Sequence, residues 1–218
     1  MNRAEYIDGV MGRLNELSWD DSSAGMFLGG DTSKVERHVE ASFMDAWRRG
    51  VALLPRHYFN QASFVYAPLY PDIPMGTGIV ELPLDFYVLA SFRMEGWRKA
   101  VFMAVEENDA VEAVQSNEFV RGNVSRPVCT LAVEAPPGPP VRGVRRVLKY
   151  YSLPCGAEHV ISEALYIALV GSLDSAVSSL DERLIAPLQW LNASVALQVV
   201  EKIELSKVAE ERATLLIN

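Results

Sequence analysis

The chain has 218 residues and a formal net charge of −8, with 50% hydrophobic and 22% charged residues. This composition is typical of a globular protein and excludes an intrinsically disordered chain. The acidic balance also argues against nucleic-acid binding by the chain as a whole, because phosphate neutralisation requires clustered lysine and arginine. We expect one domain, or one core with an appended helical part.

The cysteines and the apolar segments indicate the compartment. Cys129 and Cys155 are too few for a disulfide framework and lack the spacing of metal ligands. We expect both to be buried, in a reducing compartment. No segment approaches 18 consecutive apolar residues, and acids occupy the place of a signal peptide's apolar region. We therefore expect a protein made in the cytoplasm without a membrane anchor.

Residues 1–55 are expected to form N-terminal helices. Apolar residues recur at helical spacing over 2–18, and the turn-forming segment "DDSSAGMFLGGDTS" follows. Ser33 and Glu36 then have the spacing of a capping box, which predicts a second helix. Pro55 is expected to end that helix, because proline cannot continue the hydrogen-bond ladder.

Residues 56–77 are rich in proline and aromatic side chains. Pro68, Pro71 and Pro74 exclude a helix interior, so we expect an extended loop with one strand at "SFVYA". A loop of this length within a compact protein is uncommon unless it binds something. It is therefore the first candidate for an interaction surface.

A β-rich domain is expected over residues 56–154. Short runs rich in β-branched and aromatic residues predict strands at "GIVEL", "YVLASFRM", "KAVFMAV", "VCTLAVEA" and "RRVLKYYSL". The segment "NDAVEAVQSNEFV" predicts a short helix capped by Asn108 or Asp109, and "APPGPP" predicts a turn. We interpret Pro83–Asp85 and Glu95–Trp97 as two corners of a compact β-meander.

Basic side chains gather on the last of these strands. Arg142, Arg145, Arg146 and Lys149 are expected to face solvent or to protect a sheet edge, with phosphate binding as the weaker alternative.

Residues 155–218 are expected to form a C-terminal helical pair that makes one compact unit with the N-terminal helices. The apolar run "CGAEHVISEALYIALVGSL" predicts the first helix. The segment from Pro187 onward predicts a single long final helix with the proline in its first turn. The expected fold class is therefore α+β, with a small antiparallel β domain between two helical parts.

No catalytic template matches the sequence. The histidines have no paired spacing, and the nucleophile motif G-x-S-x-G is absent. Glu81 and Asp85 flank Pro83 and form the one candidate acid–base pair, for a hydrolase, although a turn-capping role for Asp85 is favoured. We therefore predict a protein that is not an enzyme and that binds no cofactor and no metal.

The segment "GIVELPLDFYVLASFRMEGWRKAV" carries a family resemblance. It is similar to a pattern in the tail adaptors of short-tailed bacteriophages, which are head-to-tail connector or tail accessory proteins and include the portal-attached ring proteins of crAss-like phages and prophages. A strand ending in Leu-Pro leads through an acid and an aromatic residue to a second strand, and Gly-Trp then marks a turn. The matching residues are Glu81, Leu82, Pro83, Asp85, Phe86, Ser91, Gly96, Trp97 and Arg98. Ala100 stands where the pattern has a proline.

The resemblance implies a structural virion protein of the tail connector, present in the host cytoplasm during assembly. It implies a homo-oligomeric ring that contacts the portal protein and the tail or nozzle proteins. It implies no membrane partner and no sequence-specific nucleic acid, and contact with passing DNA would be passive. A ring requires heterologous contacts between its subunits, and exposed aromatic and arginine side chains often anchor such contacts.

Six residues are candidates for these anchors. They are Tyr58, Phe59, Tyr66, Tyr70, Trp97 and Arg98. The aromatic residues of the loop favour an interface, whereas Trp97 fits an interface and a domain core equally well. The alternative function is a non-catalytic module that binds a small ligand or peptide with the loop 58–74.

Overall fold

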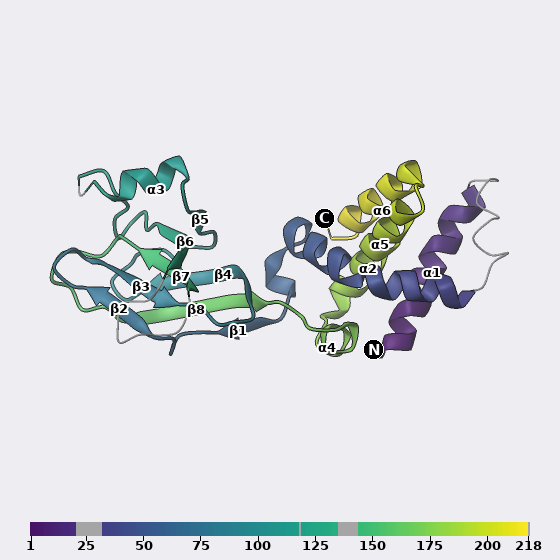
Figure 1. Ribbon diagram of the computed structural model, residues 1–218, viewed down its shortest axis with the longest axis horizontal. Coiled ribbons are helices and arrows are strands. Elements are labelled where there is room, and N and C mark those ends of the chain that lie inside the picture. The colour runs from purple at the N-terminus through teal and green to yellow at the C-terminus, as the bar shows by residue number, and fades with distance from the viewer. Residues whose placement is uncertain (21–31, 118, 135–143, 218) are drawn as a thin grey trace. The chain divides into compact units, whose positions relative to one another are not determined.

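The computed structural model describes residues 1–20, 32–117, 119–134 and 144–217 (Figure 1). The chain divides into a helical unit, residues 1–60 and 170–218, and a β unit, residues 61–169. The fold is α+β, with N-terminal helices, β-sheets and a C-terminal helical pair, as the sequence predicts. The predicted turns at "DDSSAGMFLGGDTS" and "APPGPP", the side chain of Ser33 and the position of Arg142 lie outside the described residues.

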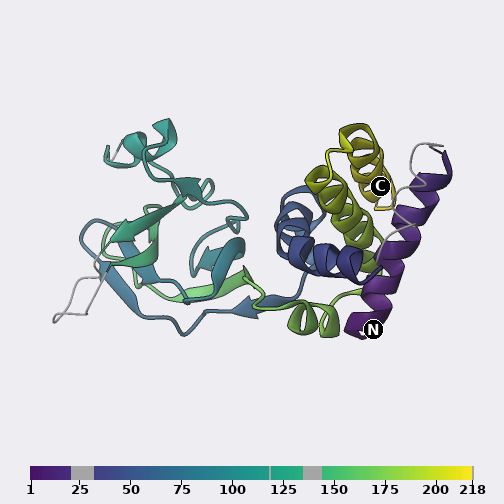
Figure 2. The same ribbon diagram turned by 45° about the vertical axis from the view of Figure 1, so that its right-hand side comes forward.

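The helical unit is built around α5 (Glu182–Val199). Helices α1 (Arg3–Asp20), α2 (Thr32–Leu53) and α6 (Ile203–Leu215) each pack against α5 (Figure 2). Every residue of α5 from Pro187 to Leu197 is buried, so this helix is covered on all sides by its neighbours. The short helices η2 (Arg56–Tyr58) and α4 (Leu173–Ser178) complete the unit. The two predicted N-terminal helices are confirmed.

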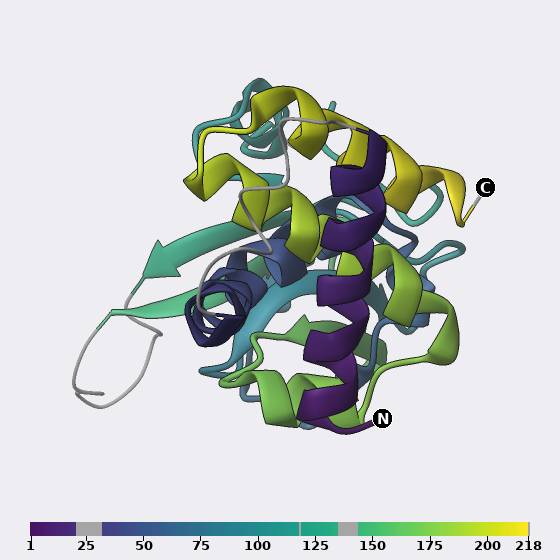
Figure 3. The same cartoon turned by 90° about the vertical axis from the view of Figure 1, so that its right-hand side faces the viewer.

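Trp190 of α5 ties three helices together. The guanidinium groups of Arg13 and Arg212 both lie against its ring, 5.3 and 4.9 Å from the ring centroid. Glu16 forms ion pairs with both arginines, at 3.1 and 3.7 Å. The purple helix that faces the viewer in Figure 3, α1, is thereby joined to α5 and α6. Cations over an indole face are attractive, and the shared carboxylate offsets the repulsion between the two arginines.

The predicted single final helix is wrong, because the chain turns between α5 and α6. Glu201 has a φ of 62°, in the left-handed region that ends helices, and the N–H of Lys202 donates to the carbonyl of Leu197 at 3.0 Å. The turn lets α6 fold back against α5, where Ala209 and Ala213 are completely buried. Pro187 is the sixth residue of α5 and does not lie in its first turn.

Two sheets form the β unit. Strand β8 (Ile161–Ala168) lies between β1 (Gln61–Ser63) and β4 (Phe86–Met94) in the three-stranded sheet. The five-stranded sheet has the order β2 (Leu69–Asp72), β3 (Thr77–Glu81), β7 (Arg145–Tyr150), β6 (Cys129–Glu134) and β5 (Val105–Glu106). The β5–β6 pair is parallel, and the other strand pairs of the described residues are antiparallel. Helix α3 (Ala110–Gln115) follows β5 (Figure 1).

The apolar run after Pro154 forms a strand, and the prediction of a helix there is wrong. Strand β8 is hydrogen-bonded on both edges, to β1 and to β4, and its inward side chains include Ile161, Ala164 and Tyr166. A short apolar run is compatible with a buried helix and with a buried strand, and its partners decide between them. The β unit therefore extends to residue 169, beyond the expected boundary at 154.

The predicted meander is also wrong. Strand β3 pairs with β2 and β7, whereas β4 pairs with β8, so the corner at Pro83–Asp85 carries the chain from one sheet to the other. The segment "KAVFMAV" forms one isolated bridge, between Phe92 and Val101, and then β5. The short helix is confirmed, with Asp109 as its N-cap and Asn108 at a φ of 71°. Cys129 is buried as expected, whereas Cys155 is exposed.

Aromatic rings fill the space between the strands of the β unit. Phe92 is stacked on Phe64, with ring centroids 6.0 Å apart, and meets the edge of Trp97 at 5.8 Å. Phe86 is stacked on Tyr166 at 5.6 Å. These residues belong to one buried cluster to which both sheets contribute. Burial of aromatic area is therefore the main physical reason that the two sheets stay together.

Candidate functional site

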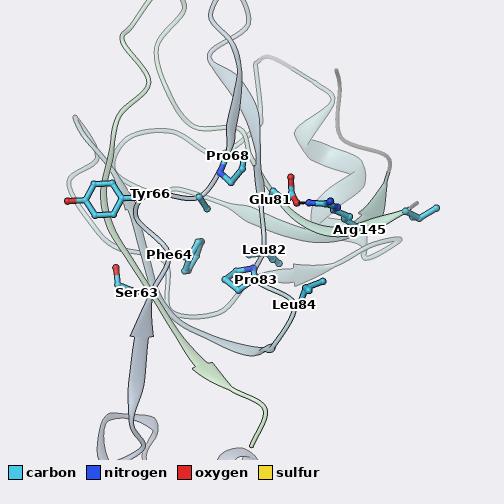
Figure 4. Close-up of a pocket in the computed structure, with 11 residues that line it drawn as sticks. Ser63, Phe64, Tyr66, Pro68, Glu81, Leu82, Pro83, Leu84 and Arg145 are labelled. Atoms are coloured by element: carbon cyan, nitrogen blue, oxygen red, sulfur yellow. Dashed lines mark ion pairs between the residues drawn. The ribbon is translucent and has the colours of Figure 1, made fainter. Parts of the chain in front are cut away.

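An apolar groove lies on the β unit where the chain leaves β1 and β3. Its cavity volume is about 560 Å³ (Figure 4). One wall is the segment 63–68, and the other is the segment 81–84 together with residues 144 and 145 at the start of β7. The groove therefore lies beside the corner that connects the two sheets.

Backbone hydrogen bonds hold both walls in place. The N–H of Phe64 donates to the carbonyl of Ala164 at 3.0 Å, which fixes the first wall to β8. The N–H of Glu81 donates to the carbonyl of Pro68 at 2.9 Å and so joins the first wall to the second. The N–H of Leu82 donates to the carbonyl of Arg146 at 3.1 Å. The backbone segments that carry the groove side chains are thus held in place by hydrogen bonds.

The apolar side chains of the groove differ sharply in exposure. Phe64 and Leu82 are buried and continue into the aromatic core. At the rim, Tyr66 is 98% exposed and Leu84 is 102% exposed, while Val144 is 66% exposed. Figure 4 shows Tyr66 on one side of the groove and Leu84 on the other. Large apolar side chains gathered around a concavity are typical of surfaces that bind a partner.

One ion pair supplies the polar part of the groove. Arg145 and Glu81 form this pair in the wall that β3 and β7 build (Figure 4). The side chain of Glu81 is only 10% exposed, whereas that of Arg145 is 41% exposed. The next residue, Arg146, donates to the carbonyl of Phe86 at 2.7 Å and lies over its ring. Arg146 is exposed as expected and also contacts the first residue of β4, whereas Arg145 joins β7 to β3 through Glu81.

Glu81 and Asp85 have different partners. Asp85 accepts a hydrogen bond at 2.9 Å from the hydroxyl of Tyr166, which lies on β8, whereas Glu81 pairs with Arg145. Burial, and then the neighbouring Asp85, raise the pKa of Tyr166 to about 12. The Asp85 carboxylate favours the protonated hydroxyl, because ionised Tyr166 would place two negative charges side by side.

This contact predicts a loss of stability in alkali. A tyrosine whose pKa is raised from 10.0 to about 12 on folding contributes stability that is complete below pH 10 and is lost as the pH rises toward 12. We expect Tyr166→Phe to cost about 1 kcal/mol at neutral pH, the net value of one hydrogen bond. That cost should shrink between pH 10 and 12, as measured by urea unfolding of both proteins. A cost that stays constant over this range would contradict the assignment.

Four of the six predicted anchor residues, Tyr66, Tyr70, Trp97 and Arg98, belong to the β unit. Tyr66 lies on the groove and is fully exposed. Tyr70 lies in β2, paired with Ile79, and does not line the groove. Arg98 is exposed, and its N–H donates to the carbonyl of Val124 at 2.8 Å. These three residues belong to separate segments of the β unit.

Burial corrects two of the other three predicted anchors, Trp97 and Phe59. Trp97 is 1% exposed within the aromatic core, and Phe59 is 5% exposed against Trp47, so neither presents a free surface. Tyr58 belongs to the helical unit and stacks with Arg183, whose guanidinium lies 5.2 Å from the ring centroid. Phe59 and Trp97 are buried because a large ring removes more apolar area from water in a core than at an edge.

Sequence reasoning missed Leu84, Val144 and Arg145 as groove residues. Leu84 could have been found from its position in "LPLDF", between a proline and an aspartate. Proline and aspartate favour a turn, and a turn at this position directs the leucine side chain toward solvent. The pairing of Arg145 with Glu81 depends on the register of β7 on β3, in which Glu81 is opposite Val147. The sequence does not indicate that register.

Two properties of the described residues complete the description of the site. No group of three or more histidine, cysteine, aspartate or glutamate side chains among them lies close enough to hold a metal ion. None of the helices in the described ranges combines the length and apolar character needed to cross a membrane.

Comparison with known proteins does not assign the chain to a family. No protein-family model matches the sequence, and the search of curated proteins also gives no match.

Proposed function

We propose that this chain is a structural subunit of a phage head–tail connector, without catalytic activity, that forms a homo-oligomeric ring between the portal and tail components. The observation that carries the proposal is the groove with Tyr66 and Leu84 at its rim. Exposure of two large apolar side chains beside an apolar concavity is unfavourable in a free subunit and becomes favourable when a partner covers them. In the proposed assembly, the adjacent portal or tail component covers this groove.

The resemblance over residues 78–102 supports the proposal, and five of the motif residues have a clear physical role. Leu82 and Pro83 line the groove. Asp85 fixes the corner by accepting from Tyr166, and Gly96 permits a turn with a φ of 84°. Trp97 anchors that turn in the core. The motif therefore builds a rigid frame with a groove, which suits a subunit that must hold a neighbour at a constant position.

The groove can be tested with the variant Tyr66→Ala/Leu84→Ala. We expect its affinity for the portal protein of the same phage to fall by about 10-fold or more, the usual effect of removing two interface anchors. Sedimentation velocity of the chain with purified portal measures this. The control is Met103→Ala, since Met103 is 72% exposed on the same unit and does not line the groove.

The class of protein has its own test. A gene for a portal, capsid or terminase protein beside this gene would support the connector. A chain that stays monomeric both alone and with its portal would overturn the proposal.

One observation favours the alternative function, a small-ligand or peptide-binding module. The cavity volume of about 560 Å³ falls within the range typical of small-molecule sites, and its walls include part of the loop 58–74. Tyr66→Ala should then abolish ligand binding, measured by calorimetry with a library of short apolar peptides, while assembly is unchanged.

A further inference from the structure

A second groove on the β unit combines aliphatic side chains with two arginines. It lies between α3 and the segment 120–128, and its cavity volume is about 550 Å³. We call it the α3 groove. The side chains that carry the argument are Val111, Val114, Val120, Arg121 and Arg126.

Hydrogen bonds hold the α3 groove in shape. The buried side chain of Gln115 accepts from the N–H of Gly122 at 2.8 Å and donates to the carbonyl of Val111 at 2.7 Å. Asn123 accepts from the N–H groups of Ser125 and Arg126, at 2.9 and 3.1 Å. Helix α3 and the segment 120–128 are therefore fixed to each other, and a partner would meet a preformed surface.

The two arginines of the α3 groove carry positive charge, and a guanidinium nitrogen of Arg121 lies 4.0 Å from Sγ of Cys155. None of the ion pairs among the described residues includes Arg121 or Arg126. The carboxylates of α3 have other partners, since Asp109 accepts from the N–H of Val111 and Glu112 from that of Asn108. Val111, Val114 and Val120 are 45, 42 and 60% exposed. A fitting partner would present carboxylates beside aliphatic side chains.

The turn between α5 and α6 presents that combination. Val199, Val200 and Ile203 are 59, 39 and 49% exposed, and Glu201 and Glu204 are exposed beside them. Glu201 has a φ of 62°, where glycine is the usual residue and any other residue costs about 1–2 kcal/mol. We call residues 199–204 the acidic turn. It presents two carboxylates and three aliphatic side chains, with Lys202 between the two glutamates, and Glu204 forms an exposed ion pair with Lys207 at 3.1 Å.

We infer that the acidic turn of one copy of this chain docks in the α3 groove of the next copy, with Glu201 and Glu204 facing Arg121 and Arg126. This inference rests on the proposed homo-oligomer and names the two surfaces that meet in it. The surfaces are different, so the contact is heterologous, and repetition of such a contact produces a ring when the rotation closes. The aliphatic side chains supply burial, and the four charges set the orientation.

Charge reversal on either side tests the contact. The groove variant is Arg121→Glu/Arg126→Glu, and the turn variant is Glu201→Lys/Glu204→Lys. Each should weaken self-association at least about 10-fold, measured by sedimentation velocity, because like charges then face each other. An equimolar mixture of the two variants should associate again, because each reversed surface meets the matching surface of the other chain. The control Glu95→Lys/Glu158→Lys adds the same charge as the turn variant at exposed positions elsewhere and should associate like the unmodified chain.

The outcomes separate this contact from its rivals. An unmodified chain that stays monomeric at its highest soluble concentration overturns the inference, as do variants that associate normally or a mixture that stays dissociated. Loss of binding to a short DNA duplex by the groove variant, with self-association unchanged, overturns it in favour of a phosphate-binding surface. If both variants still form a ring on the portal, this contact is refuted and the connector proposal stands. If the mixture of the two variants associates again but the unmodified chain does not bind the portal, the connector proposal is refuted and this contact stands.

Discussion

Trp97→Ala is expected to lower the free energy of unfolding of the β unit by about 3–5 kcal/mol. The indole is 1% exposed and contacts the rings of Phe92 and Tyr150, with centroids 5.8 and 6.5 Å away. Alanine would leave a cavity in the aromatic cluster that joins the two sheets. Urea unfolding followed by circular dichroism measures the loss, and hydrogen exchange of amides in residues 61–169 assigns it to the β unit.

The neighbouring residue provides a matched control. Arg98 is exposed, so Arg98→Ala should change the free energy of unfolding by no more than about 0.5 kcal/mol. The two variants also separate the two interpretations that the sequence left open for Trp97. An interface tryptophan would leave stability unchanged when truncated and would weaken partner binding. If Trp97→Ala and Arg98→Ala were equally stable, the burial of Trp97 would be refuted.

Gly76→Ala is expected to destabilise the β unit by at least about 3 kcal/mol. Gly76 has a φ of 66°, and an added Cβ would lie 2.1 Å from the carbonyl oxygen of Leu153. The turn at Gly76 also holds the segment after β7, since the N–H of Leu153 donates to the carbonyl of Gly76 at 3.1 Å. Alanine therefore adds backbone strain and also displaces the segment that leads from β7 toward β8.

Gly96→Ala separates the cost of backbone strain from the cost of a steric clash with a neighbouring atom. Gly96 has a φ of 84°, but an added Cβ would meet no atom within 4 Å. Its cost should be the left-handed strain alone, about 1–2 kcal/mol. Thermal unfolding of both variants gives the comparison. If both variants lost the same free energy of unfolding, the backbone around Gly76 would have to move away from the added methyl group at no energetic cost. That result would contradict the close contact with Leu153.

Local sequence signals predicted those elements whose ends and faces are decided by neighbouring residues. The helix after Asp109 begins at a side-chain cap, and the N-terminal helices follow from apolar spacing and from Pro55. The strand at "YVLASFRM" follows from β-branched and aromatic content. In each case the information lies within a few residues of the element, so it can be read from the sequence.

The failures share a cause, which is pairing between distant segments. Strand β8 is apolar enough for a buried helix, and only its bonds to β1 and β4, each about 70 to 100 residues away in the chain, make it a strand. The end of α5 depends on the packing of Ala209 and Ala213 against it. For the candidate site, the sequence indicated Tyr66 and the interest of "ELPLDF", but not that Arg145 would complete the wall.

By itself, the sequence determined the α+β class, the N-terminal helices, the helix after Asp109 and the strands at "GIVEL", "YVLASFRM", "VCTLAVEA" and "RRVLKYYSL". The strand predicted at "SFVYA" is wrong, because β1 ends at Ser63. The confirmed elements follow from capping, proline geometry, apolar period and β-branched content, which are local properties. Only the tertiary structure decided that Pro83–Asp85 joins two sheets, that Trp97 is buried and that Leu84 is exposed at a groove. Those outcomes depend on which distant strands pair. Pairing is selected by the total apolar area that the whole β unit removes from water, and no short segment contains that sum.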